Sequence, residues 1–289
     1  MVDRDKPVDI RPDLPHSARI YDYFLGGKDN YEADRAAAEK IEQAIPSVRE
    51  VARGNRAFMI RAVRYLSDLG VRQFLDIGTG IPTEPNLHQV AQETAPDSRV
   101  VYVDNDPIVL AHARALLTGT PEGVTRYAEA DVTEPERILA DPAVQQTLDF
   151  GKPVALSLIA LCHFVPGERI YDIIDTLLEP LAPGSYLVMT HLTTDFDPQI
   201  VEGTVQAYRH SGIAMEARTR EGVSRFFRDL ELVEPGIVAI DSWYPDGEQP
   251  QPVPEREESR PASNVTLLRA VVLEPAAAGY AAVGRKPAE

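Results

Sequence analysis

Two glycines and a carboxylate follow an apolar run near residue 73, and their spacing suits a nucleotide. The run QFLDI contains Asp76 and is followed by Gly78-Thr79-Gly80. Glycines at such a turn let a ligand approach the backbone closely, and nucleotide-binding turns follow strands in this way. A dinucleotide fingerprint would place a third glycine at the position of Thr83. The turn therefore predicts a nucleotide-type ligand, but it lacks one of the three glycines that a dinucleotide's pyrophosphate site has.

Further carboxylates close the next two apolar runs of the chain. Asp104 ends RVVYVD, where an acidic side chain accepts hydrogen bonds from ribose hydroxyls. Asp106 stands just before Pro107 and is expected to cap the following helix. Asp131 ends the third run and is expected near an adenine, although a simple turn carboxylate would look the same. A lone glycine turn could be only a tight turn, but these residues together favour a nucleotide site.

A histidine lies in the fourth apolar segment, LIALCHFVP, on the same predicted rim. His163 could act as a general base near neutral pH, although a lone histidine on an apolar rim is more often a packed, hydrogen-bonded residue. Cys162 is expected on the opposite face of a strand, which argues against a Cys–His couple. His191 and Asp195 are weaker candidates near the acceptor. No His, Asp or Glu grouping has metal-ligand spacing, and one cysteine excludes a Cys-based zinc site.

The elements that must position these residues alternate between strands and helices. The expected strands are the runs QFLDI, RVVYVD, VTRYAEA, PVALSLIAL and GSYLVMTHL, and the expected helices lie near 84–95, 107–118, 134–140 and 167–180. Strands without polar alternation, separated by helices, indicate a parallel sheet that is covered on both faces. The sequence therefore predicts a doubly wound α/β domain, whose ligands bind at the carboxyl ends of the strands.

The C-terminal third departs from this rhythm. Residues 235–245 and 263–275 both resemble strands, and the Pro- and charge-rich segment 246–262 between them has no helical period. Because parallel neighbours need a crossover, these two strands are expected to form an antiparallel hairpin with a long, dispensable loop. The last residues, 276–289, are expected to be a loose tail.

The N-terminal part precedes the predicted sheet. Residues 1–16 are expected to be a mobile arm, Tyr31 to Ile45 a helix, and a second helix is expected to begin at Pro46 and end at Gly70. Between the arm and these helices lies an aromatic group, Tyr21, Tyr23, Phe24 and Tyr31, beside Gly26-Gly27. Aromatic faces attract cations, including a sulfonium, but aromatics at such spacing can equally be ordinary core.

Composition bounds the class of protein. The chain has 289 residues and a formal net charge of −16, and no basic cluster offers the cationic face that nucleic acid requires. Neither a secretory signal nor an apolar stretch long enough to span a bilayer occurs in the sequence. We therefore expect a cytoplasmic protein without nucleic-acid or membrane partners; the oligomeric state stays open.

These motifs resemble those of the class I S-adenosylmethionine-dependent methyltransferases. LDIGTG is similar to their first motif, VYVDNDP to their second, ADVT to their third and LIALCHFVP to their fourth. The N-terminal stretch HSARIYDYFLGGKDNYEADRAAAE resembles more specifically an actinobacterial methyltransferase family formerly called DUF574. The resemblance implies a Rossmann-like seven-stranded mixed sheet with an antiparallel last strand, preceded by a helical extension. It divides the chain into a lid-forming part, 1–70, a cofactor domain, 71–275, and a tail, 276–289.

The resemblance also implies roles for individual residues toward S-adenosyl-L-methionine. Asp76, Gly78, Thr79 and Gly80 would face the methionyl part. Asp104 would hold the ribose, with Asn105 beside the adenine. The remaining assignments are the adenine ring for Asp131 and Val132, the fourth-strand lip for Ala160 and His163, and the lid for Tyr21, Tyr23 and Phe24. Independently of the resemblance, Arg56 interrupts the apolar face of its helix and could pair with the cofactor carboxylate, although a solvated surface arginine is the default interpretation. Ile81-Pro82-Thr83 departs from the family's small residues and puts the seating of the cofactor tail in doubt.

The resemblance implies methyl transfer from S-adenosyl-L-methionine but does not supply the acceptor. We expect in-line transfer to a small molecule, and His163 is the candidate base by its position. Two alternatives remain open at this point. A nicotinamide-dependent oxidoreductase is weakened by Thr83 and by the antiparallel terminal hairpin. A non-catalytic protein that binds S-adenosyl-L-methionine as a regulator would have the same cofactor cleft.

Overall fold

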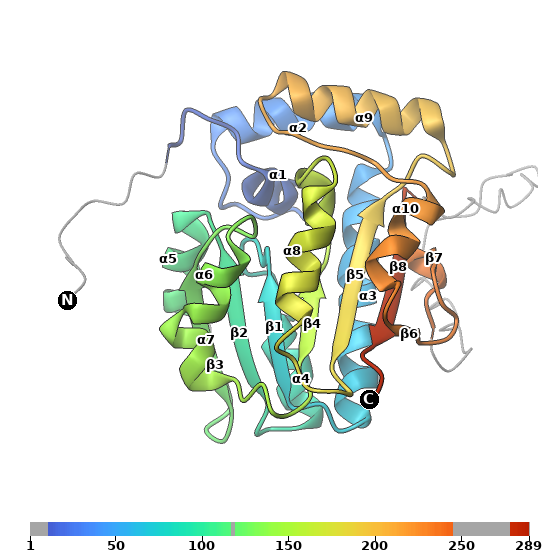
Figure 1. Cartoon of the computed structure of the whole chain (residues 1–289). Helices are drawn as coiled ribbons and strands as arrows, with labels where there is room; N and C mark the ends of the chain where they lie inside the picture. The colour runs from blue at the N-terminus through green and yellow to red at the C-terminus, as the bar shows by residue number, and fades with distance from the viewer. Residues whose placement is uncertain (1–10, 117–118, 245–277, 289) are drawn as a thin grey trace, which may run out of the picture.

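The computed structural model describes residues 11–116, 119–244 and 278–288. A mixed sheet forms the centre of the molecule and helices cover both of its faces (Figure 1). The strand order is β3-β2-β1-β4-β5-β8-β6, and the short β7 also pairs with β8. The strands are β1 (Gln73–Ile77), β2 (Arg99–Asp104), β3 (Val124–Glu129), β4 (Ala155–Leu158), β5 (Tyr186–Leu192), β6 (Glu231–Leu232), β7 (Val238–Ala239) and β8 (Gly279–Arg285).

Strands β1 to β5 are parallel, and β8 runs antiparallel to β5. Successive strands are added on one side of β1 as far as β3 and then on its other side from β4 onward. The carboxyl ends of β1 and β4 therefore flank a crevice of the kind that binds ligands in open α/β sheets. The predicted fold class, a doubly wound mixed sheet with an antiparallel last strand, is confirmed.

The antiparallel strand lies where the sequence predicted a loose tail. Residues 276–289 contain β8, which pairs with β5 along seven residues from Gly279 to Arg285. Its small residues are required by close packing, because a Cβ at Gly284 would lie 2.6 Å from the Phe227 ring. The expected strand at 263–275 and the expected loop at 246–262 lie outside the described residues. The prediction of a C-terminal tail was therefore wrong.

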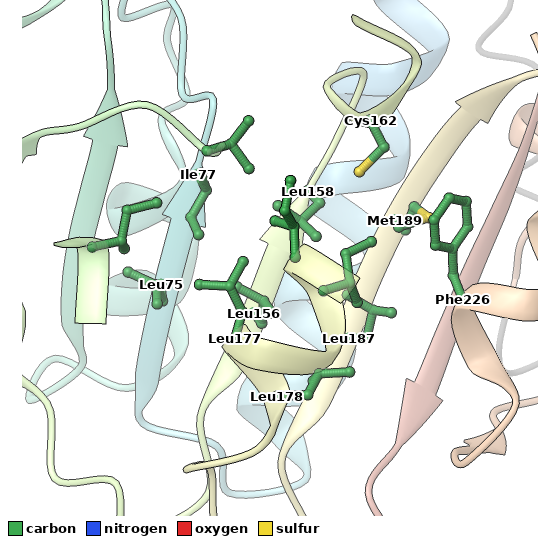
Figure 2. Packing of buried hydrophobic residues seen from close by; sticks show 14 of the residues in the cluster. Leu75, Ile77, Leu156, Leu158, Cys162, Leu177, Leu178, Leu187, Met189 and Phe226 are labelled. Atoms are coloured by element: carbon green, nitrogen blue, oxygen red, sulfur yellow. The ribbon is translucent and has the colours of Figure 1, made fainter. Parts of the chain in front are cut away.

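The two faces of the sheet bury separate apolar clusters. On one face, α3 (Val48–Asp68) and α4 (Leu87–Thr94) pack against β-strand residues such as Phe74 and Val100. On the other, α6 (Pro135–Ala140), α7 (Pro142–Thr147) and α8 (Arg169–Leu178) cover Leu75 and Leu156. Figure 2 shows how Leu177 of α8 meets Leu156 across this second face. Adjacent residues of β1 thus serve opposite faces, as the pleat requires.

A third apolar cluster lies above the carboxyl ends of the strands (Figure 1). We call its helices the cap: α1 (Ser17–Phe24), α2 (Glu32–Ala44), the first turns of α3, and α9 (Pro198–His210). Buried Ile20, Ile41 and Val205 join these helices into one small core. The sequence predicted α2 but not α9, which the chain inserts after β5. Because the second half of α3 packs on the sheet, residue 70 is not a packing boundary.

Two further α-helices lie in the described ranges. Helix α5 (Pro107–Leu116) follows β2, and α10 (Arg220–Ser224) follows the cap helix α9. No helix in the described part of the chain is long and apolar enough to cross a membrane.

Candidate functional site

A pocket opens at the carboxyl ends of β1, β2 and β4, beneath α1 of the cap. It contains about 890 Å³ of space free of protein atoms, open solvent included. We call it the rim pocket. Ten of the residues predicted from the sequence line it: Tyr21, Arg56, Asp76, Gly78, Thr79, Gly80, Asp104, Asn105, Val132 and Ala160.

The glycine turn adopts a backbone conformation that suits glycine. Gly78 and Gly80 have φ angles of +73° and +67°, a region that favours glycine. A Cβ at Gly78 would lie 2.7 Å from the Leu161 side chain, whereas nothing lies within 4 Å of the Cβ position of Gly80. The turn therefore leaves open space over Gly80 for a ligand.

The helix after this turn begins later than expected. Helix α4 starts at Leu87, after Asn86, whose side chain accepts a hydrogen bond from the backbone of Thr83 at 3.1 Å. A capping box between Asn86 and Gln89 satisfies its first turn. Strand β1 ends at Ile77 and α4 begins only at Leu87, so a loop separates them. The helix therefore does not start at the turn, and no third glycine is needed to let helix and strand pack closely there. This accounts for Thr83 at the fingerprint position.

Asp104 lies at the end of β2 and borders the rim pocket. Its two carboxylate oxygens accept hydrogen bonds from the backbone nitrogens of Gly80, at 2.8 Å, and Asp106, at 2.9 Å. Burial raises the pKa of Asp104 despite these bonds. A carboxylate has about four lone-pair positions, so Asp104 keeps acceptor capacity for a ligand. Asp106 accepts from Ile108 at 3.0 Å and caps α5, as predicted.

Opposite charges face each other on the other side of the pocket. Burial raises the pKa of Asp76 to about 6, and the nearby Arg56 guanidinium partly opposes this rise. Arg56 itself donates to the carbonyl oxygens of Thr83 and Pro85, so it fixes the loop that follows the glycine turn. The default interpretation of Arg56 as a solvated surface residue does not apply.

The two predicted residues that follow β3 differ in their position relative to the rim pocket. Val132 borders the pocket, whereas Asp131 is connected to it through Asn105, whose side-chain nitrogen donates to Asp131 at 2.7 Å. Burial alone would raise the pKa of Asp131, but hydrogen bonds from Thr133 and Asn105 lower it. Asp131 is therefore a charged support of Asn105 in this structure.

A second pocket adjoins the first beneath the cap. It shares four lining residues with the rim pocket, Tyr21, Asn55, Ala160 and Phe164. We call it the cap pocket. Ala160 has a φ angle of +53°, which is unusual for a residue with a side chain and costs about 1–2 kcal/mol in this left-handed region. Such outliers gather at functional sites, and Ala160 stands where the two pockets meet.

His163 lies in the cap pocket, outside the lining of the rim pocket that was predicted for it. After β4 the chain forms a short 3₁₀ turn, Cys162–Phe164, in place of the expected longer strand. Cys162 enters the sheet core, where burial raises its thiol pKa to about 12. His163 and Cys162 are separated as predicted, but by a helical turn rather than by strand alternation.

A neighbouring histidine is held in one protonation state. Nε2 of His191 lies 3.0 Å from the Arg218 guanidinium, and Nδ1 lies 2.7 Å from the Leu192 carbonyl oxygen. Because arginine can only donate, Nε2 must accept and Nδ1 must carry the proton. Burial lowers the pKa of His191 to about 3. Burial, His191 and Arg218 also lower the pKa of His163 well below its ordinary value.

The aromatic residues of α1 serve different purposes. Tyr21 borders both pockets and donates its hydroxyl to the Ala52 carbonyl at 3.0 Å. Phe24 is buried and borders only the cap pocket among the described pockets. Tyr23 borders neither and packs its ring 4.7 Å from the Arg49 guanidinium. Of these three residues only Tyr21 borders the rim pocket, whereas Phe24 and Tyr23 pack in the apolar cluster of the cap.

Comparison with known proteins identifies the family. Residues 3–287 match a family model described as S-adenosyl methyltransferase. The chain belongs to this family. The cofactor of the methyltransferase is thus S-adenosyl-L-methionine, and the family leaves no basis for the nicotinamide alternative. No curated protein matches the sequence.

Two solved structures are similar over nearly the whole methyltransferase. A DUF574-family protein from Streptomyces avermitilis MA-4680 is 46% identical, with a TM-score of 0.85, covering 96% of this chain and 100% of its own. A protein from Thermobifida fusca YX, provisionally described as a methyltransferase, is 41% identical with a TM-score of 0.81, covering 95% and 96% respectively. These matches confirm the predicted DUF574-type resemblance.

The rim pocket of the methyltransferase fits this cofactor. Its carboxylate at Asp104 retains acceptor capacity, open space lies over Gly80, and Asp76 and Arg56 offer both signs of charge. No group of three or more His, Cys, Asp or Glu side chains that could hold a metal ion occurs in the described ranges.

Sequence reasoning missed residues that enter the site from distant segments. Ser17 and Ala18 of α1 and Met59 of α3 border the rim pocket, and Tyr208 of α9 borders the cap pocket. The sequence pattern marks Asn55, a polar residue that interrupts the apolar face of its helix, and this residue borders both pockets. No comparable pattern marks Ser17, Ala18, Met59 or Tyr208.

Proposed function

We propose that the methyltransferase transfers a methyl group to a small-molecule acceptor that occupies the cap pocket, by in-line displacement. The observation that supports this most is the junction of the two pockets at Tyr21, Asn55, Ala160 and Phe164. Donor and acceptor would be held in adjoining spaces, and alignment supplies much of the rate in such reactions.

The cofactor contacts in this proposal follow the rim pocket. Asp104 accepts hydrogen bonds from the ribose hydroxyls, and Asn105 and Val132 face the adenine, with Asp131 orienting Asn105. Arg56 pairs with the methionyl carboxylate and Asp76 with the methionyl ammonium, beside Gly78, Thr79 and Gly80. When bound, the cofactor supplies an electrophilic methyl group whose bonding electron pair stays on sulfur.

The protein's own task is to orient both molecules and exclude water. Tyr21 and Phe164, which border both pockets, cover the junction from the cap and from the β4 rim. Such cover favours transfer to the acceptor over loss to solvent. In this proposal His163, which borders the cap pocket, receives the proton of a hydroxyl nucleophile, and its lowered pKa favours release of that proton to water.

The acceptor class is tested with methyl-labelled S-adenosyl-L-methionine and a cell extract. We expect label to appear in the dialysable fraction, because the cap pocket lies beneath a helical cover that a macromolecule would have to displace. Asp104→Ala is the control and should remove most of this signal. Label confined to protein or nucleic acid would contradict the proposal, and no label at all would favour a binding protein without turnover.

Cofactor binding should depend on pH through Asp76. Its pKa in the free protein is about 6, and the cofactor's ammonium favours the ionised carboxylate. Affinity should therefore be constant above about pH 7 and fall as the pH drops through 6, approaching tenfold per pH unit. Calorimetry with S-adenosylhomocysteine from about pH 5 to about pH 8 measures this. Asp76→Asn should bind more weakly and show a flat profile; a flat wild-type profile would refute the assignment of Asp76.

A further inference from the structure

The cap pocket is apolar over most of its lining. Phe24, Ile45, Val48, Phe164, Met215 and Ile240 all border it. It contains about 600 Å³ of space free of protein atoms, open solvent included. An acceptor that fills this space must present a mainly apolar surface.

Charged acceptors do not suit this lining. None of the described residues that border the cap pocket is Asp, Glu, Lys or Arg. Both bordering histidines have pKa values lowered by burial, so they are neutral at physiological pH. An ammonium or carboxylate placed there would lose its hydration without gaining a counter-ion, which is strongly unfavourable.

The hydrogen-bonding groups of the pocket are mostly engaged within the protein. His191 uses both ring nitrogens, Thr190 accepts from the Ala160 nitrogen at 2.9 Å, and Thr204 donates to Ile200 at 2.8 Å. Two atoms differ, because Nδ1 of His163 and Oδ1 of Asn55 are buried and have no hydrogen-bond partner among the described residues. A buried polar atom without a partner calls for a specific explanation, and the imidazole belongs to a residue that borders a cavity.

We propose that the acceptor is a neutral, predominantly apolar small molecule whose hydroxyl group donates a hydrogen bond to the ring of His163. This inference rests on the proposed function, since it assigns the acceptor to the cap pocket. The hydroxyl would then approach the junction at Ala160, because Ala160 and His163 both border the same pocket.

Three probes with the same naphthalene ring and different charge test the inference. They are 2-naphthol, 2-naphthoate and 2-naphthylmethylammonium, titrated by calorimetry at neutral pH into the full chain saturated with S-adenosylhomocysteine. We expect 2-naphthol to bind at least about tenfold more tightly than either ion, since only the ions lose charge hydration. Equal or tighter binding of an ion, or no binding of 2-naphthol, would overturn the proposed acceptor class.

Variants locate the binding. His163→Phe should weaken 2-naphthol binding about tenfold, and His163→Gln, which keeps an acceptor atom, should restore most of it. Thr204→Leu fills the cap pocket and should also weaken binding, whereas Gln206→Leu, on the same helix but outside the pocket lining, should not. Undiminished binding to both Thr204→Leu and His163→Phe would place the probe elsewhere and refute the proposal.

The same titrations separate this inference from the proposed function. If the wild-type chain does not bind S-adenosylhomocysteine, the proposed use of the rim pocket is wrong. If it binds S-adenosylhomocysteine but prefers a charged naphthyl probe, the proposed function stands and the acceptor class is wrong.

Discussion

Deleting residues 1–31 should leave the sheet folded but reduce methyl transfer by about 100-fold or more, because a covered site is lost. The deletion removes α1, and with it the part of the rim-pocket lining that His16, Ser17, Ala18 and Tyr21 provide. The two clusters on the faces of the sheet contain no residue of α1. On the truncated chain, circular dichroism measures folding, calorimetry with S-adenosylhomocysteine measures cofactor binding, and label transfer measures turnover.

Two controls sharpen this experiment. Deleting residues 1–10 removes none of the contacts described for α1 and should leave binding and transfer unchanged. Tyr21→Ala should reproduce part of the loss, because Tyr21 borders both pockets. A truncated chain that binds the cofactor at full strength and turns over normally would rule out the lid. Global unfolding would instead show that Ile20 and Phe24 are indispensable core residues.

Asp104→Ala should weaken binding of S-adenosyl-L-methionine by about 1–3 kcal/mol, or roughly 10- to 100-fold. The variant removes a buried carboxylate that borders the pocket and retains acceptor capacity for the ribose hydroxyls. It also leaves the Gly80 nitrogen without its partner, which loosens the glycine turn. Calorimetry with S-adenosylhomocysteine gives the dissociation constants.

The matched control is Asp97→Ala. Asp97 is an exposed carboxylate before β2, paired with Arg72, so its loss changes net charge equally at a distance from the pocket. Its dissociation constant should equal that of the wild type. If Asp104→Ala also bound with wild-type affinity, the ribose contact would have to lie on another residue.

The parallel sheet and its ligand-binding rim were predictable because both depend on short-range patterns. Continuous apolar runs such as RVVYVD mark strands that are buried on both faces. Once such strands are parallel, their carboxyl ends meet at one edge, so Asp104 and Gly80 come within hydrogen-bonding distance. Capping of α5 by Asp106 is equally local and was predicted correctly.

The remaining features depend on packing between distant segments. Strand β8, GYAAVGR, contains two glycines and two alanines, which carry little strand preference. Its position is set by pairing with β5 and by close contact at Gly284. Helix α9 forms the cap only by packing on α2, far away in the sequence. Contacts between distant segments also determine the hydrogen bond between Arg218 and His191. They likewise form the cap pocket, which His163 borders in place of the rim pocket.

The central claim is that the cofactor binds in the rim pocket and the acceptor in the cap pocket. A crystal structure of the methyltransferase with S-adenosylhomocysteine tests it most directly. The account predicts the ribose hydroxyls within hydrogen-bonding distance of Asp104 and the sulfur atom at Ala160, facing the cap pocket. A ribose bound to other residues, or a sulfur atom directed away from the cap pocket into solvent, would contradict it.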